Sequence, residues 1–124
     1  MATLVETKPV SLERSIVILK ELLAEHAAYR SRGYQHAKTE ERSVTLFDSL
    51  QNRYALVDLG WFDKKHSCKT VILAELLDGK LWIQQDDTEE GIADELVKTG
   101  IDSQHIVLGY RPEEMRSLTG FAVK

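Results

Sequence analysis

The segment LWIQQDDTEEGIADELVKTG, residues 81–100, and the segment HIVLGYRP, residues 105–112, decide the fold of this chain. The first begins with an apolar stretch around Trp82, passes through four acidic side chains, and continues into a run with apolar residues at helical spacing. A glycine ends that run, and a second apolar stretch follows. This order predicts a strand, a helix and another strand in succession.

The predicted helix starts at the acidic residues. Asp87 is predicted to be the N-cap, because its carboxylate can accept hydrogen bonds from free backbone N–H groups, and Glu90 completes a capping-box pattern. Gly91 is predicted to lie inside the helix, and Gly100 to end it, with Ile101 folding back onto the last turn. The buried face is predicted to contain Ile92, Ala93, Leu96 and Val97.

The residues just before this segment predict a tight hairpin. Asp78-Gly79 separates two strand-like runs, and a two-residue type I′ turn needs the positive φ angles that Asp-Gly tolerates. The turn sets a register in which Leu77 faces Lys80, Leu76 faces Leu81, Glu75 faces Trp82, and Ala74 faces Ile83. The predicted core face contains Ile72, Ala74, Leu76, Leu81 and Ile83. The opposite face contains Leu73, Glu75, Trp82 and Gln84, and we expect a second covering element or a partner subunit on it.

Further towards the N-terminus, helical spacing precedes strand-like alternation. The apolar residues Leu12, Ile16, Leu19, Leu23 and Ala27 predict a long amphipathic helix that begins after Ser11 and ends near Gly33. Strands are predicted at Val44–Phe47, Tyr54–Trp61, Lys69–Leu76, Leu81–Gln85 and His105–Tyr110, followed by a helical turn from Pro112 and an extended piece at Phe121–Val123. Residues 1–10 are predicted to form a flexible arm, and residues 11–124 one domain. The predicted fold class is α+β, with an antiparallel β-meander packed against the long helix and a shorter helix in the C-terminal half.

Composition limits the functional classes. The chain has 124 residues and a net charge of −4, which opposes direct binding of DNA through its phosphates. No apolar run is long enough to span a bilayer, and the N-terminal residues lack the pattern of a secretory signal, so we expect a cytoplasmic protein without membrane contact. The single cysteine, Cys68, is predicted to be an ordinary strand residue.

Three patterns suggest chemistry, and each has a simpler structural explanation. Asp58 upstream of Asp78-Gly79-Lys80 is similar to a metal-dependent nuclease element, but Asp78-Gly79 is better explained as the hairpin turn. The cluster Asp86, Asp87, Glu89 and Glu90 could bind Mg²⁺ or Ca²⁺ through oxygen ligands, but helix capping accounts for most of it. The four histidines lack zinc-ligand spacing. We therefore expect no enzyme activity, no metal site and no cofactor, and the acidic cluster leaves a metal-dependent activity as a third alternative.

A longer set of residues resembles one family. It is densest after residue 78 and comprises Asp78-Gly79-Lys80, Trp82-Ile83-Gln84-Gln85-Asp86, Thr88-Glu89, Gly91-Ile92-Ala93, Glu95-Leu96, Gly100, Ile106-Val107-Leu108-Gly109-Tyr110, Pro112, Arg116, Thr119 and Phe121-Ala122-Val123, with Leu59-Gly60-Trp61 upstream. Together these residues resemble the XisI-like family, the fdxN element excision controlling factors.

The resemblance implies an accessory protein that acts with a second factor, XisH, in controlling the excision of a DNA element by a site-specific recombinase in the heterocyst-forming, filamentous cyanobacteria. The candidate surface for binding an XisH-like partner, or a second copy of the chain, consists of Trp61, Leu73, Glu75, Trp82 and Gln84. In this interpretation contact with DNA is indirect. The alternative is an accessory factor that binds duplex DNA directly, with candidate phosphate contacts at Arg30, Arg32, Lys64, Lys65 and Lys69.

Overall fold

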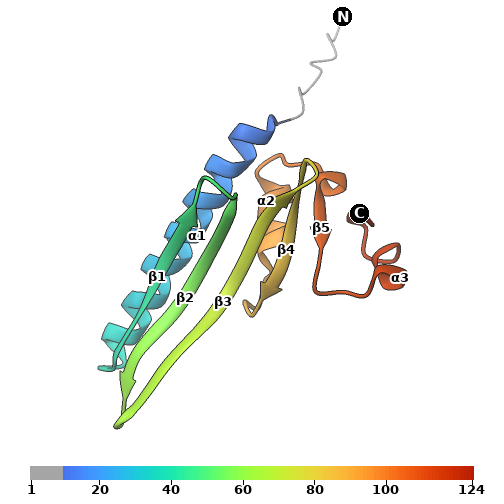
Figure 1. The fold of residues 1–124 in the computed structure, drawn as a ribbon. Coiled ribbons are helices and arrows are strands. Elements are labelled where there is room, and N and C mark those ends of the chain that lie inside the picture. The colour runs from blue at the N-terminus through green and yellow to red at the C-terminus, as the bar shows by residue number, and fades with distance from the viewer. Residues whose placement is uncertain (1–9) are drawn as a thin grey trace, which may run out of the picture.

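The four strands of the predicted meander are consecutive in the chain and adjacent in the sheet. In this computed structural model, which describes residues 10–124, one sheet has the strand order β1-β2-β3-β4-β5. The elements are α1 (Leu12–His36), β1 (Glu40–Asp48), β2 (Arg53–Phe62), β3 (Lys65–Leu77), β4 (Lys80–Asp86), α2 (Ile92–Lys98), a 3-10 turn (Ser103–His105), β5 (Ile106–Leu108) and α3 (Glu113–Arg116). Both α1 and α2 lie on the same side of the sheet (Figure 1). The predicted α+β class is confirmed.

The first four strands pair antiparallel, and β5 pairs parallel to β4. Parallel neighbours cannot be joined by a tight turn, so the chain crosses over through α2, which packs against the sheet on the way. Helix α2 therefore forms the crossover connection and also contributes Ile92 and Leu96 to the core.

The hairpin between β3 and β4 has the predicted register. All four expected pairs, from Leu77 opposite Lys80 to Ala74 opposite Ile83, are present. Asp78 and Gly79 have φ angles of 50° and 77°, as a type I′ turn requires. The predicted core face is also confirmed, since Ile72, Ala74, Leu81 and Ile83 are buried and Leu76 packs against the same cluster.

Helix α1 begins as predicted and ends later than predicted. The Ser11 hydroxyl caps it by accepting a hydrogen bond from the Arg14 N–H at 3.1 Å, and Leu19 and Leu23 are fully buried against the sheet. The predicted end at Gly33 is wrong, because the helix continues to His36. A glycine inside a helix costs only about 1 kcal/mol, which contacts between the last turn and the sheet can offset. Within the predicted flexible arm, only Val10 is described, and it packs against the core; residues 1–9 lie outside the described part of the chain.

Strands β1 and β3 are four residues longer at their starts than predicted. Both extend the same end of the sheet, so the hairpin of β2 and β3 projects past the end of α1 (Figure 1). Gly60 makes this extension possible, because a Cβ atom there would lie 2.2 Å from the backbone oxygen of Glu40. The hairpin turns at Asp63 and Lys64, which have φ angles of 48° and 65°.

The start of α2 differs from the prediction in the residue that caps it. Asp86, at the end of β4, accepts from the backbone N–H of Ile92 at 2.6 Å and from that of Thr88 at 2.9 Å. Asp87 does not cap the helix, and Gly91 lies before the helix with a φ angle of 86°. The loop between strand and helix folds around one carboxylate, so the capping group comes from six residues upstream of the helix.

The end of α2 follows the prediction. Gly100 has a φ angle of 109°, and Ile101 is buried and donates its N–H to the Leu96 carbonyl. Val97, which was predicted on the buried face, is instead exposed. The predicted final extended piece is reduced to a bridge between Ala122 and Val107. Among residues 10–124, no helix combines the length and apolar character needed to cross a membrane.

Candidate functional site

The sheet has one face covered by helices and one face that is mostly bare. Side chains alternate along each strand, so every second residue points away from α1 and α2. We call this second surface the open face, and its central part consists of Arg42, Val44, Leu46, Arg53, Ala55, Val57, Leu59, Cys68, Thr70, Leu73, Glu75, Trp82 and Gln84. Across β1 and β2 no described helix or strand covers it; Leu46 on β1 is 58% exposed, whereas Val57 on β2 is only 9% exposed. Six of its members are aliphatic, which is unusual for a surface that meets only water.

The structure brings together four of the five predicted partner contacts. Glu75 lies opposite Trp82 in the ladder, and the Gln84 side chain donates a hydrogen bond to the Glu75 carboxylate at 3.0 Å. Leu73 lies on the same strand two residues away. Trp61 points to the same side but is six residues along β2 from Ala55, the residue paired with Leu73. At about 3.3 Å per residue, this separation is about 20 Å, so Trp61 belongs to a different part of the molecule.

The C-terminal segment, residues 109–124, covers one end of the open face. We call it the strap. Gly109 lets the strap pass close to β4, since a Cβ atom there would lie 2.6 Å from the Gln84 side-chain oxygen. The Arg116 guanidinium lies over the Trp82 ring, 5.1 Å from its centroid. The strap is thus the second covering element expected on this face, over Trp82.

The strap is held by polar contacts at its own ends. Arg116 donates from Nε to the Arg111 carbonyl at 3.0 Å and from Nη1 to the Val123 carbonyl at 3.1 Å. Beneath it, the buried indole N–H of Trp82 has no acceptor among the described residues. An unsatisfied buried donor weakens the closed arrangement. The strap therefore covers the Trp82 ring but provides no hydrogen-bond acceptor for its indole N–H.

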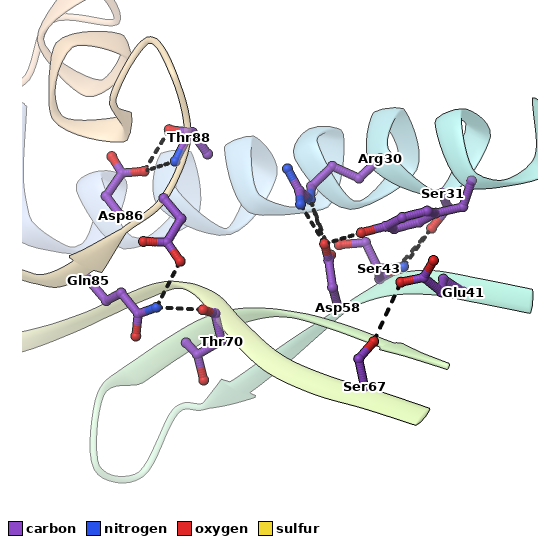
Figure 2. Close-up of polar contacts among 12 residues, drawn as sticks. Arg30, Ser31, Glu41, Ser43, Asp58, Ser67, Thr70, Gln85, Asp86 and Thr88 are labelled. Atoms are coloured by element: carbon purple, nitrogen blue, oxygen red, sulfur yellow. Dashed lines mark hydrogen bonds and ion pairs between the residues drawn. The ribbon is translucent and has the colours of Figure 1, made fainter. Parts of the chain in front are cut away.

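Sequence reasoning missed a buried ionic cluster between α1 and β2. Asp58 is 1% exposed and accepts from Arg30 Nε at 3.1 and 3.2 Å, from Arg30 Nη2 at 2.5 Å, and from the Tyr34 hydroxyl at 2.5 Å. Figure 2 shows Arg30 reaching from the helix to Asp58 on the sheet. Two signals in the sequence pointed to it: Asp58 continues the inward alternation of Tyr54 and Leu56, and Arg30 and Tyr34 are one helical turn apart.

The electrostatics of this cluster keep Asp58 ionised. Burial alone would raise the pKa of Asp58, but hydrogen bonds from Arg30 and Tyr34 outweigh it and hold the pKa below its usual value. The pKa of Tyr34 is raised by burial and by its hydrogen bond to Asp58. Both Asp58 oxygens are occupied by donors. The carboxylate that suggested a nuclease element therefore has a structural explanation as the anchor of α1.

A second contact between α1 and the sheet, next to this cluster, pairs backbone groups of the edge strand β1 with a side chain of α1. The Ser31 hydroxyl donates to the Ser43 carbonyl at 3.1 Å and accepts from the Ser43 N–H at 3.0 Å. These are groups of an edge strand that would otherwise be free to pair with another chain. Helix α1 therefore blocks β1 at its midpoint (Figure 2).

The acidic cluster does not form a set of metal ligands in the described residues. Asp86 is engaged in capping, while Asp87, Glu89 and Glu90 are exposed and line a hollow between α1 and the loop before α2. Glu95 at the rim of that hollow is hydrogen-bonded to His26 at 2.8 Å. Across residues 10–124, no group of three His, Cys, Asp or Glu side chains has an arrangement that could hold a metal ion.

The predicted phosphate contacts separate into two groups. Lys64, Lys65 and Lys69 lie at or near the projecting turn of β2 and β3, together with Trp61. The arginines lie on α1, where Arg30 is engaged with Asp58 and Arg32 is exposed beside it on the helix. The tip therefore combines basic side chains with an aromatic residue that the sequence had placed in the partner surface.

The fold and these surfaces define the class: a small α+β protein in which an antiparallel meander is extended by a β-α-β crossover and one sheet face is left largely bare. The chain belongs to the XisI family, because the family model described as XisI protein matches residues 11–123. No curated protein sequence matches it at a significant level.

Solved structures with a similar fold include two proteins from Anabaena variabilis. One is described as a XisI-like protein from Anabaena variabilis, with 27% sequence identity and a TM-score of 0.81 over 92% of this chain and 100% of that chain. Another is described as the fdxN element excision controlling factor XisI from the same organism, with 26% identity and a TM-score of 0.72 over 91% of this chain and 98% of that chain.

Proposed function

We propose that this chain is an accessory protein that controls excision of a DNA element, and that it acts by binding an XisH-like protein through its open face. Membership of the XisI family and the similarity to a protein described as an excision controlling factor support the first part. The observation that carries the second part is the aliphatic surface on β1, β2 and β3, whose most exposed member is Leu46 and whose members Leu59 and Leu73 are partly exposed. In this proposal the chain contributes binding, and the chemistry of excision belongs to other proteins.

The physical argument rests on the composition of the open face. A sheet face that only meets water is normally polar, whereas here Leu46 is exposed and Leu59 and Leu73 are partly exposed on neighbouring strands, next to the buried Val57. Its rim carries both signs of charge, including the pair of Arg53 and Glu75, with Nε and Oε2 3.4 Å apart. An apolar centre with a polar rim is the usual anatomy of a protein–protein interface.

The test is association with an XisH-like protein encoded in the same genome. We expect the wild-type chain to co-purify with it, and Leu46→Arg to weaken the complex at least about tenfold, because a charge would be buried within the contact. Leu46 is 58% exposed, so the free chain should keep its fold. The matched control is Leu12→Arg, an exposed leucine on α1.

Two results would contradict this proposal. If the wild-type chain forms no complex, the XisH-like protein is not its partner. If Leu46→Arg and Leu12→Arg both bind as strongly as the wild type, the interface does not lie on the open face. Circular dichroism of each variant shows whether the fold is intact, so that loss of binding is not confused with unfolding.

A further inference from the structure

We infer that the tip of the β2–β3 hairpin is a binding site for single-stranded nucleic acid, in which an unpaired base stacks on Trp61 and neighbouring phosphates pair with Lys38 and Lys64. This inference does not depend on the open face or on its partner. The tip is about 20 Å along the sheet from Leu73, and it projects past α1 into solvent (Figure 1).

Two large aromatic side chains are exposed at this tip. Trp61 is 51% exposed and Phe62 is 58% exposed, although strand ends usually carry polar side chains. His66 packs edge-on against Trp61, with ring centroids 5.0 Å apart and an interplanar angle of 62°. This contact orients the indole while half of its surface remains free. A free aromatic ring of this kind is what proteins use to stack unpaired bases.

The tip also has a hollow that joins these aromatics to lysines from two different turns. Its lining consists of Lys38, Thr39, Glu40, Trp61, Phe62, Asp63 and Lys64. Lys38 follows the end of α1, and Lys64 lies in the hairpin turn. The two lysines meet only because α1 ends beside the hairpin.

Both lysines are in a backbone conformation that disfavours them. Lys38 has a φ angle of 60° and Lys64 a φ angle of 65°, positions at which glycine or asparagine fits without steric cost. The fold alone would favour glycine at both sites. A strained residue at a functional position is a common observation, and here the two strained lysines line the same hollow, together with the acidic residues Glu40 and Asp63.

Charge distinguishes the tip from the rest of the molecule. The segments 38–42 and 58–69, which face one another at this end of the sheet, carry five basic side chains, Lys38, Arg42, Lys64, Lys65 and Lys69, against four acidic ones, Glu40, Glu41, Asp58 and Asp63, and thus a net charge of +1. The whole chain carries −4, so the remainder carries −5. An anionic polymer is therefore repelled less at the tip than elsewhere on the molecule.

Single strands fit this site better than a duplex. A duplex stacks its bases inside and presents only their edges, so it cannot use the face of Trp61. It would bind through phosphates alone, and the tip has few lysines for that purpose. An unpaired strand supplies both a base face and phosphates, and it can follow a narrow hairpin.

The experiment measures binding of the full chain to a fluorescently labelled oligothymidylate and to a duplex of the same length across a salt series. We expect the single strand to bind more tightly than the duplex. Trp61→Ala should weaken single-strand binding roughly five- to hundredfold, the range for loss of one stacked base. In a Trp82→Phe background, the remaining tryptophan, Trp61, should lose fluorescence on binding.

A second variant separates binding from folding. Lys64→Gly removes a charge and relieves the strained backbone, so its melting temperature should stay the same or rise while its affinity and the salt dependence of binding fall. The control is Lys98→Ala, which changes the net charge equally at the far end of α2 and should bind as the wild type does.

Three results would overturn the inference: no binding of the single strand, unchanged affinity in both Trp61→Ala and Lys64→Gly, or a preference for the duplex. Binding that Lys98→Ala weakens as much as Lys64→Gly would also overturn it, because the attraction would then be general rather than local. Since no XisH-like protein is present in this assay, its outcome is separate from that of the partner test.

Discussion

Asp58 is one of the residues of β2 whose side chains point inward. The preceding inward residues, Tyr54 and Leu56, have buried, largely apolar side chains. A buried carboxylate is tolerated only when charged or polar partners satisfy it. Arg30 and Tyr34 provide three donors, and both come from the last part of α1. These contacts explain why α1 continues through Gly33, since ending there would remove Tyr34 from the helix. The ionic cluster thus accounts for the continuation of α1 past Gly33.

We predict that Asp58→Asn lowers the free energy of unfolding by about 2–3 kcal/mol, because it leaves Arg30 without its partner. The expected loss is below that of a fully buried pair because the Arg30 side chain retains 29% exposure to water. Chemical denaturation followed by circular dichroism measures it. Asp63→Asn, an exposed aspartate in the hairpin turn, is the control and should change stability little. Equal stability of both variants would show that the cluster does not anchor α1.

The same cluster predicts a dependence of stability on pH. The pKa of Asp58 is lowered in the folded chain, so the carboxylate stabilises the fold fully above the pKa of an unfolded aspartate, about 3.9. This contribution is lost as the pH falls through the lower folded pKa. We expect the wild-type free energy of unfolding to fall more steeply below about pH 4 than that of Asp58→Asn. Parallel curves for the two chains would contradict this assignment.

Among the elements, the strap is the one whose position depends on the fewest buried contacts. Between Leu108 and the end of the chain, Ala122 is its only described residue classed as buried, and Leu118 is 78% exposed. Arg116 joins the strap to itself through two carbonyls and contacts the sheet at Trp82, and two backbone N–H groups of the strap, those of Gly109 and Ala122, donate to sheet carbonyls at 2.8 Å. An element held in this way opens more easily than the sheet beneath it.

We predict that Arg116→Ala opens the strap over Trp82. In a Trp61→Phe background, Trp82 should then show red-shifted emission and stronger quenching by acrylamide, while overall stability falls by only about 1 kcal/mol. Arg111→Ala is the matched control, because its guanidinium lies over Tyr110 instead, 5.3 Å from the ring centroid. Unchanged emission in Arg116→Ala would mean that other contacts hold the strap.

At the scale of the whole molecule, the sheet is a single layer covered on one side. Strands β2, β3 and β4 have a hydrogen-bonded neighbour on each edge, whereas β1 has one neighbour strand, and β5 pairs with β4 on one edge and forms only an isolated bridge to Ala122 on the other. Helices α1 and α2 bury the inner face, so the core lies between them and the strands. Protection from solvent should therefore decrease from the centre of the sheet outwards.

We predict that hydrogen exchange follows this order. Amides of residues 54–58 in β2 and of residues 69–74 in β3, away from the exposed hairpin tip, should exchange slowest, and those of the strap fastest. The Ser43 amide should be protected despite its place on the sheet edge, since it donates to Ser31. Ser31→Ala should speed exchange at Ser43 without changing it in β3. Equally slow exchange in the strap and in β3 would contradict this ranking of local stability.

Several features of this protein were determined by the sequence alone. They include the start of α1 at Ser11, the register around Asp78-Gly79 and the end of α2 at Gly100. Each depends on interactions within a few residues, such as a capping hydroxyl or a turn that needs positive φ angles. For the same reason the inner and outer faces of the β3–β4 hairpin could be assigned from alternation.

Other features were decided only by the tertiary structure. The pairing of Arg30 with Asp58 joins residues that are 28 positions apart in the chain. The N-terminus of α2 is capped by Asp86 rather than by the adjacent Asp87. Trp61 lies beside the lysines of the tip and not with the other residues of the predicted partner surface. In each case the stabilising partner is distant along the chain or lies on a loop whose path local propensity does not fix. Such interactions contribute free energy only after the strands and α1 have assembled, so no local pattern in the sequence contains them.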